Sequence, residues 1–450
     1  MSLHLDVRRP ALLLAAVALV FVTGACAGYS DRTKDARAAL DAGRTRDALK
    51  LFNERLDVDT EKDLPRDLQG EKVLFVLERS VVLQSLDEYQ WSARDLEVSD
   101  KQIEVLDFTH GTLDDISKFM FSDDSGPYQA PPYEKLMINT LNMINYLTRG
   151  DLNGARIEAR RLAVMQQFIS ERESGEAIVG GPGSYLAGFT FERSKEPGEA
   201  LRFYDEALQQ GSYASLHGPV ARLSKFDGYR TERIKQALAA AAPAEADDDS
   251  GELLVVVGYG RVPAKRALRL PIGLALTLAS GDLSPDSRAT ANRLAAQGLV
   301  TWVNMPTLPK PTRQYAAPIF NVDQRPMPLE GSLAVDHEAV KAWNSTKGKM
   351  IASAITRLIT RVVAGEVARK ATGGGTIGLL ASLGTQATLT ATDTPDTRSW
   401  STLPARIAIG RVRLPPGPHV IELAADGQRK QQTINLTKNG WAVVSLTVLR

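Results

Sequence analysis

The chain has 450 residues, 54 Lys and Arg against 53 Asp and Glu, and 43% hydrophobic residues. This length is enough for two or three domains with proper hydrophobic cores. The single cysteine excludes an internal disulfide and any metal site built from several thiolates. After the first 28 residues, no apolar run approaches the roughly 20 residues that a membrane-spanning helix needs.

The N-terminus has the layout of an export signal. Two arginines precede an apolar run over residues 11–22, and small residues lead into Cys26. This layout is typical of a secretory signal peptide. A cysteine directly after the small residues resembles the lipobox of bacterial lipoproteins, although Thr23 stands where that pattern prefers Leu. We therefore expect a signal peptide over residues 1–25 and lipidation of Cys26. The alternative is an ordinary signal peptide cut near a neighbouring alanine.

The near-zero net charge hides two halves of opposite sign. Residues 27–250 carry 28 Lys and Arg against 40 Asp and Glu, whereas residues 251–450 carry 24 against 12. The sign changes at an acidic, alanine-rich segment, residues 241–251, which has the composition of a linker. Either the halves dock through complementary surfaces, or each faces a different partner. Tethering favours docking, because it makes the encounter intramolecular.

Residues 26–240 are predicted to be an all-α domain of helical hairpins. Three segments place an alanine five residues after a turn residue: Gly43 and Ala48, Gly150 and Ala155, Lys195 and Ala200. Each segment resembles the second half of a tetratricopeptide repeat (TPR), in which alanine lets two helices approach closely. The resemblance implies a degenerate TPR-like solenoid with a concave surface for a partner. Gly150, Ala155 and Tyr204 are its candidate contact residues. The alternative is a helical bundle without a groove.

Residues 252–450 are predicted to be an α+β domain, so that the whole chain is an α+β multi-domain protein. We expect strands within residues 252–303, extended loop over residues 304–330 and helices over about 335–385. Four β-rich runs over residues 405–450 are joined by turn sequences that favour hairpins. They predict a four-stranded meander, which packs on the earlier strands as a β-sandwich or mixed module with inserted helices.

The predicted helix over residues 347–370 has a basic character. Its apolar residues recur at helical spacing, and Glu366 is the one acidic residue among several lysines and arginines. Such a helix suits an anionic lipid surface or the acidic half of the same chain. The alternative is a core-packing helix with a solvated basic face.

The sequence offers no candidate catalytic or metal-binding residues and predicts no cofactor. The five histidines are scattered, and no pair has the spacing of a helical zinc site. Asp336, His337 and Glu338 form a polar cluster near an expected helix start, where capping is the usual role. Nucleophile and Walker motifs are missing, and export removes the protein from nucleic acid. We therefore predict a protein that is not an enzyme.

Four segments carry a further resemblance: residues 150–162, 262–265, 396–404 and 413–417. They are similar to a family of Gram-negative lipoproteins with a TPR-like N-terminal half and a β-rich C-terminal half. The resemblance implies no particular enzymatic activity. It implies a context like that of envelope lipoproteins encoded near activators of cell-wall synthases. Trp400, in the most characteristic segment, joins the candidate partner-binding residues.

Together these patterns predict a lipid-anchored protein on the periplasmic face of the outer membrane. Ala27 follows the cysteine, whereas Asp there usually retains a lipoprotein at the inner membrane. The expected role is a scaffold or regulator that binds an unidentified envelope protein during envelope assembly. The alternative is an envelope enzyme such as a peptidoglycan-acting hydrolase.

Overall fold

A computed structural model describes residues 28–109, 128, 130–172, 181–242, 249–279, 281–298, 300–371 and 395–450. The predicted signal peptide, Cys26 and most of the predicted linker lie outside these residues. The structure is about 52% helix and 19% strand, with helices in the N-terminal half and sheets in the C-terminal part. This distribution confirms the predicted mixed class. Among the described residues, no helix is both long and apolar enough to cross a membrane.

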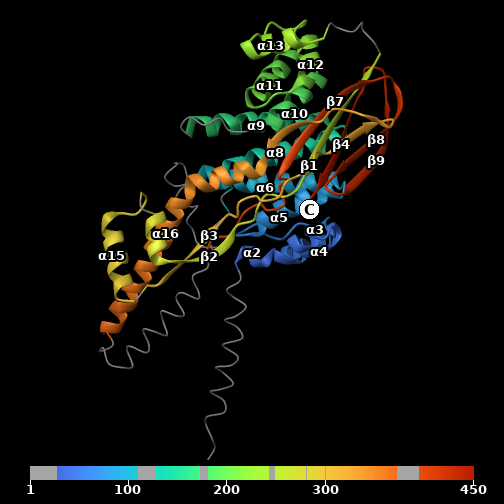
Figure 1. Cartoon of the computed structure of the whole chain (residues 1–450). Helices are drawn as coiled ribbons and strands as arrows, with labels where there is room; N and C mark the ends of the chain where they lie inside the picture. Colours follow the sequence, from blue (N-terminus) through green and yellow to red (C-terminus); the bar gives the residue numbers. More distant parts are fainter. Residues whose placement is uncertain are drawn as a thin grey trace, which may run out of the picture.

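The N-terminal half is a succession of helices that pack against their chain neighbours. They are α2 (Tyr29–Arg32), α3 (Lys34–Asp41), α4 (Thr45–Leu56), α5 (Lys72–Ser85), α6 (Tyr89–Thr109), α8 (Pro132–Thr148), α9 (Leu152–Arg172), α10 (Gly181–Arg193), α11 (Pro197–Gln210), α12 (His217–Leu223) and α13 (Glu232–Ala240). The closest pairs include α5 with α6, α8 with α9, and α10 with α11 (Figure 1).

The predicted turn residues stand between paired helices. Gly43, Gly150 and Lys195 have φ angles of 72°, 74° and 61°, in the left-handed region that ends helices. The alanines that follow them, Ala48, Ala155 and Ala200, are fully buried. The hairpin interpretation of these segments is therefore confirmed. The close helix contacts follow from the small alanine side chain.

The C-terminal part contains two four-stranded sheets. The central sheet has the order β10-β1-β7-β6, made of β1 (Gly251–Tyr259), β6 (Glu330–Ala334), β7 (Arg406–Leu414) and β10 (Trp441–Val448). The second sheet has the order β5-β4-β8-β9, made of β4 (Ile319–Val322), β5 (Arg325–Pro326), β8 (Gly417–Ala425) and β9 (Gln428–Leu436). Strand β1 pairs with β10 in parallel and with β7 antiparallel.

The four C-terminal strands exist as predicted, but they do not form a meander. Only β8 and β9 pair as a hairpin, while β7 and β10 both pair with β1. The physical reason is that β1 is buried along its whole length and needs a strand on each side to satisfy its backbone groups. The loop expected over residues 304–330 is also wrong in part, because residues 319–326 form the β4–β5 hairpin.

Strand β1 lies between two hydrophobic layers. Leu254 and Val256 point into the core that the central sheet shares with the helices. Leu253, Val255 and Val257 point into the core between the two sheets. Alternate residues of a strand face opposite sides, so a strand buried on both sides has the continuous apolar run seen here. The body of the molecule therefore has three layers, with helices, central sheet and second sheet in that order (Figure 1).

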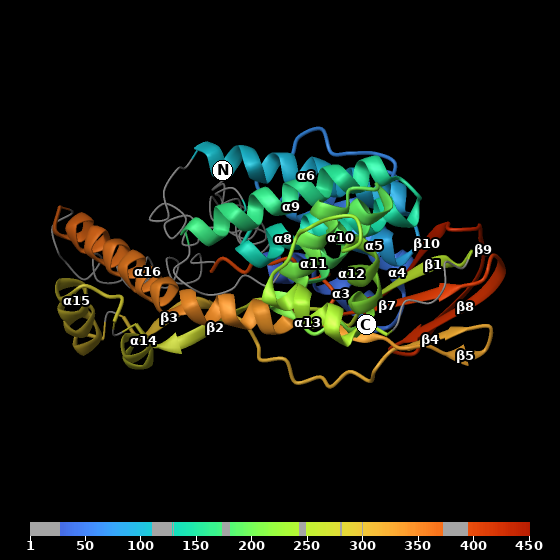
Figure 2. The ribbon, with the colours of Figure 1, turned by 90° about the horizontal axis from the view of Figure 1, so that it is seen from above.

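A smaller unit projects from this body, and we call it the arm (Figure 2). It consists of residues 266–307, with β2 (Arg266–Pro271), α14 (Ile272–Leu278), α15 (Pro285–Ala296) and β3 (Trp302–Thr307), together with α16 (Val335–Ala371). Its own core contains Ile351, Ile355 and Leu358 from the apolar stripe of α16. This stripe packs inside the arm, as the core-packing alternative for the basic helix predicted.

Candidate functional site: the polar interface between helices and sheet

The helical half and the central sheet share one hydrophobic core. Trp400 and Leu403, from the segment that leads into β7, are fully buried among residues of the helical half. Three carboxylates of the helical half meet the C-terminal half at this interface. Of the two alternatives for the oppositely charged halves, the structure shows the one in which they contact each other directly.

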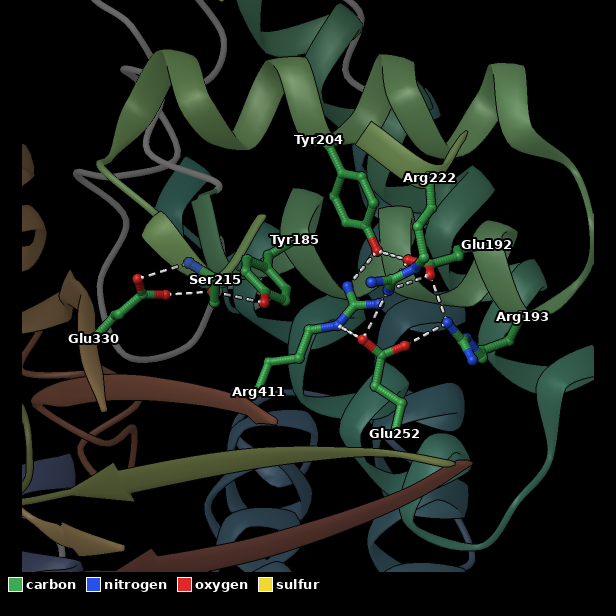
Figure 3. A network of polar contacts seen from close by, with 9 residues as sticks. All are labelled: Tyr185, Glu192, Arg193, Tyr204, Ser215, Arg222, Glu252, Glu330 and Arg411. Carbon is green, nitrogen blue, oxygen red and sulfur yellow. Dashed lines mark hydrogen bonds and ion pairs between the residues drawn. The ribbon is translucent and has the colours of Figure 1, made fainter. Parts of the chain in front are cut away.

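The first carboxylate, that of Glu192 on α10, belongs to a cluster of charged residues around Arg411 (Figure 3). Arg411 lies on β7, and its side chain is 2% exposed. Its guanidinium donates from Nε to Glu252 of β1 (2.7 Å), from Nη1 to the hydroxyl of Tyr204 (2.8 Å) and from Nη2 to Glu192 of α10 (2.7 Å). One side chain of the sheet therefore binds groups from two helices and a neighbouring strand.

Two further arginines pair with the same carboxylates. Arg193 forms ion pairs with both Glu192 and Glu252. Arg222 reaches Glu252 at 3.0 Å and Glu192 at 3.5 Å. Three guanidinium groups thus surround two carboxylates, and the hydroxyl of Tyr204 donates a further hydrogen bond to Glu192. Buried charges are tolerated when they are paired and hydrogen-bonded in this way.

The cluster holds its carboxylates ionised. Burial alone would raise the pKa of Glu192, but Arg411, Arg193 and Arg222 outweigh burial and hold that pKa far below its ordinary value. Burial is likewise outweighed at Glu252, where Arg411 lowers the pKa. The pKa of Arg411 is raised, because the two carboxylates more than offset its burial. Groups with such pKa values do not exchange protons near neutral pH, so this arrangement suits a permanent contact and not acid–base catalysis.

The second carboxylate, Glu78 on α5, holds the segment before β7. It is fully buried and accepts hydrogen bonds from the backbone N–H of Ser401 (3.0 Å) and of Thr402 (2.7 Å). The hydroxyl groups of Ser401 (2.7 Å) and Tyr29 (3.2 Å) donate to it as well. This set of donors ties α2, α5 and the C-terminal half together at one point.

The third carboxylate is Glu134 at the start of α8. It accepts from the backbone N–H of Trp400 (3.2 Å) and from the hydroxyl groups of Tyr133 (3.0 Å) and Tyr128. Burial raises the pKa of Glu134 more than these hydrogen bonds lower it. A proton on this carboxyl is therefore more stable in the folded protein than in water.

The structure places most of the predicted partner-binding residues inside the molecule. Ala155, Tyr204 and Trp400 are fully buried, and Tyr204 belongs to the Arg411 cluster. These three side chains are therefore packed against their own chain and are not available at the surface for a partner. Gly150 lies in an exposed turn with a positive φ angle. Cys26 lies outside the described residues.

Sequence reasoning missed the charged residues of the interface. Glu252 directly precedes the apolar run of β1, Arg411 interrupts an apolar strand, and Glu78 stands within an apolar stretch of α5. A charged residue in the middle of an apolar run is the signal that was available, because such a residue is usually buried with a partner.

Outside this interface, metal-binding or catalytic groups among the described residues would form a second candidate site. Among them, no group of three His, Cys, Asp or Glu residues is placed to hold a metal ion. His419, near the start of β8, lies against Asp323 of the turn between β4 and β5 (Nδ1 to carboxylate oxygen, 2.7 Å). Comparison with protein-family models, with curated proteins and with solved structures gives no match to this chain.

Proposed function

We propose that the protein is a lipid-anchored scaffold of the bacterial cell envelope, held on the periplasmic face of the outer membrane by acylated Cys26. The export signal and the cysteine that ends it support the anchor. The folded body begins close behind this cysteine, because Tyr29 is 1% exposed and packs on Phe75 with ring centroids 5.1 Å apart. An acyl group on Cys26 would therefore hold the body against the membrane without a long linker.

The helical hairpins are, in this proposal, degenerate TPR-like repeats. The side of α5, α8 and α10 that faces inward carries the chain's own sheet, through contacts of α5 and α8 with β10 and of α10 with β6. The inner side of the repeats is thus covered by the chain's own sheet and is not open to a partner protein. A protein partner would then use an outer helix face.

The observation that carries the scaffold role is the outer face of α9. Ile157 and Val164 are 54% and 69% exposed. They are seven residues apart, so they lie on the same face of the helix. Arg160 lies between them and is also exposed. An exposed apolar pair with a neighbouring arginine has the composition of a protein-binding face.

Two experiments test the proposal separately. For the anchor, Cys26→Ala should move the protein from the membrane fraction to the soluble periplasm and abolish metabolic labelling with a fatty-acid analogue. Retention of the variant in the membrane fraction would contradict the anchor.

For the scaffold, a photo-crosslinking amino acid at position 164 should capture one envelope protein reproducibly in cells. The same amino acid at position 429, whose arginine is 75% exposed on the second sheet, is the matched control and should not capture that protein. Capture of glycan strands alone at position 164 would contradict the scaffold role and favour an enzyme that acts on peptidoglycan.

A further inference from the structure

The arm exposes large apolar side chains on its outer surface. Leu274 and Leu278 are 49% and 47% exposed, four residues apart on α14, while Ile272, Ala275 and Leu276 of the same helix lie in the arm's core. Helix α14 therefore has an apolar residue on both its inner and its outer face. A helix that only packed on the arm would have polar residues on its outer face.

An exposed tryptophan continues this surface. Trp302 on β3 pairs with Pro271, the residue directly before α14, and is 42% exposed. The guanidinium of Arg269 lies over its ring, 5.6 Å from the centroid. Tryptophan beside arginine is a pairing that suits the boundary between water and a bilayer, where the ring enters the interface and the charge meets headgroups.

The arm is also strongly basic. Residues 266–307 and 335–371 carry 11 Lys and Arg against 5 Asp and Glu. Exposed examples are Arg266 and Arg269 on β2 and Lys347 and Lys349 on α16. An anionic bilayer attracts such a surface electrostatically.

The arm starts next to the beginning of the described chain. The backbone N–H of Ser30 donates to the hydroxyl of Thr397 (3.0 Å), and the hydroxyl of Ser399 accepts from the backbone N–H of Lys265 (3.2 Å). Lys265 directly precedes β2. Figure 1 shows α2 beside β2 and β3, at the end of the body from which the arm extends. Gly28 is only two residues from Cys26, so an anchored cysteine would bring this part of the arm to the membrane.

We propose that the arm is a second membrane contact, in which Leu274, Leu278 and Trp302 enter the interface of an anionic bilayer and the basic residues bind its headgroups. This inference rests on the proposed lipid anchor, which would confine the arm to the bilayer and raise its effective concentration there. Two contacts would fix the orientation of the body on the membrane. A second copy of the arm fits this surface less well, because two basic surfaces repel each other.

The test uses the full mature chain with Cys26→Ala, so that no acyl group contributes to binding. We expect it to co-sediment with vesicles of phosphatidylcholine and phosphatidylglycerol, and to bind pure phosphatidylcholine at least tenfold more weakly. The double variant Leu274→Ser/Leu278→Ser should lose at least tenfold in affinity for the anionic vesicles. Ile319→Ser/Val420→Ser is the matched control, with two apolar residues outside the arm that are 47% and 37% exposed, and should bind like its parent.

Three results would overturn the inference. They are failure of the parent to bind anionic vesicles, unchanged binding of the arm variant, and a dimer of the parent that the arm substitutions dissociate in sedimentation velocity. The last result would assign the surface to a second copy of the chain. Circular dichroism melting of each variant checks that the fold is intact. If the proposed anchor is wrong, the wild-type protein will carry no acyl group. Fatty-acid labelling detects that failure, whereas the vesicle assay tests the arm alone.

Discussion

Arg411 Nη2 lies 2.7 Å from Glu192 Oε2, and the two residues are 219 positions apart in the chain. The contact joins β7 to α10 and closes the interface between the helical half and the central sheet. Both side chains are almost fully buried, with 2% and 6% exposure. Removal of one partner from such a buried pair leaves the other charge with weaker compensation, which is more costly than the loss of an exposed pair.

Arg411→Met should destabilise the protein strongly. The substitution removes the most deeply buried of the three guanidinium groups that pair with Glu192 and Glu252, and it leaves these carboxylates with Arg193 and Arg222 alone. We expect a loss of up to about 3–5 kcal/mol in the free energy of unfolding. Urea unfolding at neutral pH, followed by circular dichroism, measures it. Arg429→Met, at a side chain that is 75% exposed, is the control and should change stability by less than about 0.5 kcal/mol. Equal effects of the two substitutions would show that the Arg411 cluster does not hold the halves together.

Glu78→Gln should destabilise the contact between α5 and the segment before β7. One oxygen of Glu78 accepts from the backbone N–H of Thr402, and the other accepts from the N–H and hydroxyl of Ser401. The glutamine amide nitrogen cannot accept, so one buried donor loses its partner at a cost of about 1–3 kcal/mol. Glu54→Gln, at an exposed position of α4, is the matched control. Urea unfolding measures the stability of both variants. If Glu78→Gln does not change the free energy of unfolding, the proposed role of this carboxylate is contradicted.

The contribution of Glu192 should depend on pH. Its pKa in the folded protein lies well below the ordinary value of 4.5. A depressed pKa means that ionised Glu192 stabilises the fold above about pH 4.5, and that this contribution is lost as the pH falls toward the folded pKa. The stability difference between wild type and Glu192→Gln should therefore be largest near pH 7 and shrink below pH 4.5.

The contribution of Glu134 to stability should change with pH in the opposite direction to that of Glu192. Burial raises its pKa above the ordinary value of 4.5, so the protonated form is favoured in the folded state. Its contribution to stability is fully present below pH 4.5 and is lost as the pH rises through the folded pKa. Wild type should therefore gain stability relative to Glu134→Gln as the pH falls. Urea unfolding of both variants from pH 7 to pH 3 measures the two trends, and parallel trends would contradict the assigned environments.

Gly188→Ala should destabilise the interface through a steric clash. A Cβ atom at position 188 on α10 would lie 2.4 Å from Cδ1 of Tyr204. The Tyr204 ring is fully buried and its hydroxyl is bound to Arg411 and Glu192, so it has little room to move. We expect a loss of about 1–3 kcal/mol.

Gly273→Ala is the control for this clash, because a Cβ atom at position 273 of α14 meets nothing within 4 Å. We expect it to be neutral or to stabilise the protein by up to about 1 kcal/mol, since alanine favours a helix over glycine. Thermal melting of the two variants measures the difference. Equal melting temperatures would show that Tyr204 adapts to the added methyl group.

Most local elements of this protein can be predicted from short-range sequence patterns. Helix pairs were predictable because turn chemistry acts within a few residues, as at Gly43, Gly150 and Lys195, and because small alanines mark close helix contacts. Strand β1, with its doubly buried run, and the four strands β7 to β10 were predictable from their apolar patterns, whereas β4 and β5 lie in a proline-rich segment that was expected to be loop. The opposite charges of the two halves also indicated that they dock.

The way in which these elements combine depends on long-range contacts that the sequence patterns do not contain. The pairing of β7 and β10 with β1, and the burial of Tyr204 and Trp400, depend on contacts between residues that are far apart in the chain. Arg411 and Tyr204, for example, are 207 positions apart. Neither residue's neighbours in the sequence indicate the other. The stability of a buried charge depends on which groups surround it in space, and local periodicity contains no information about those groups.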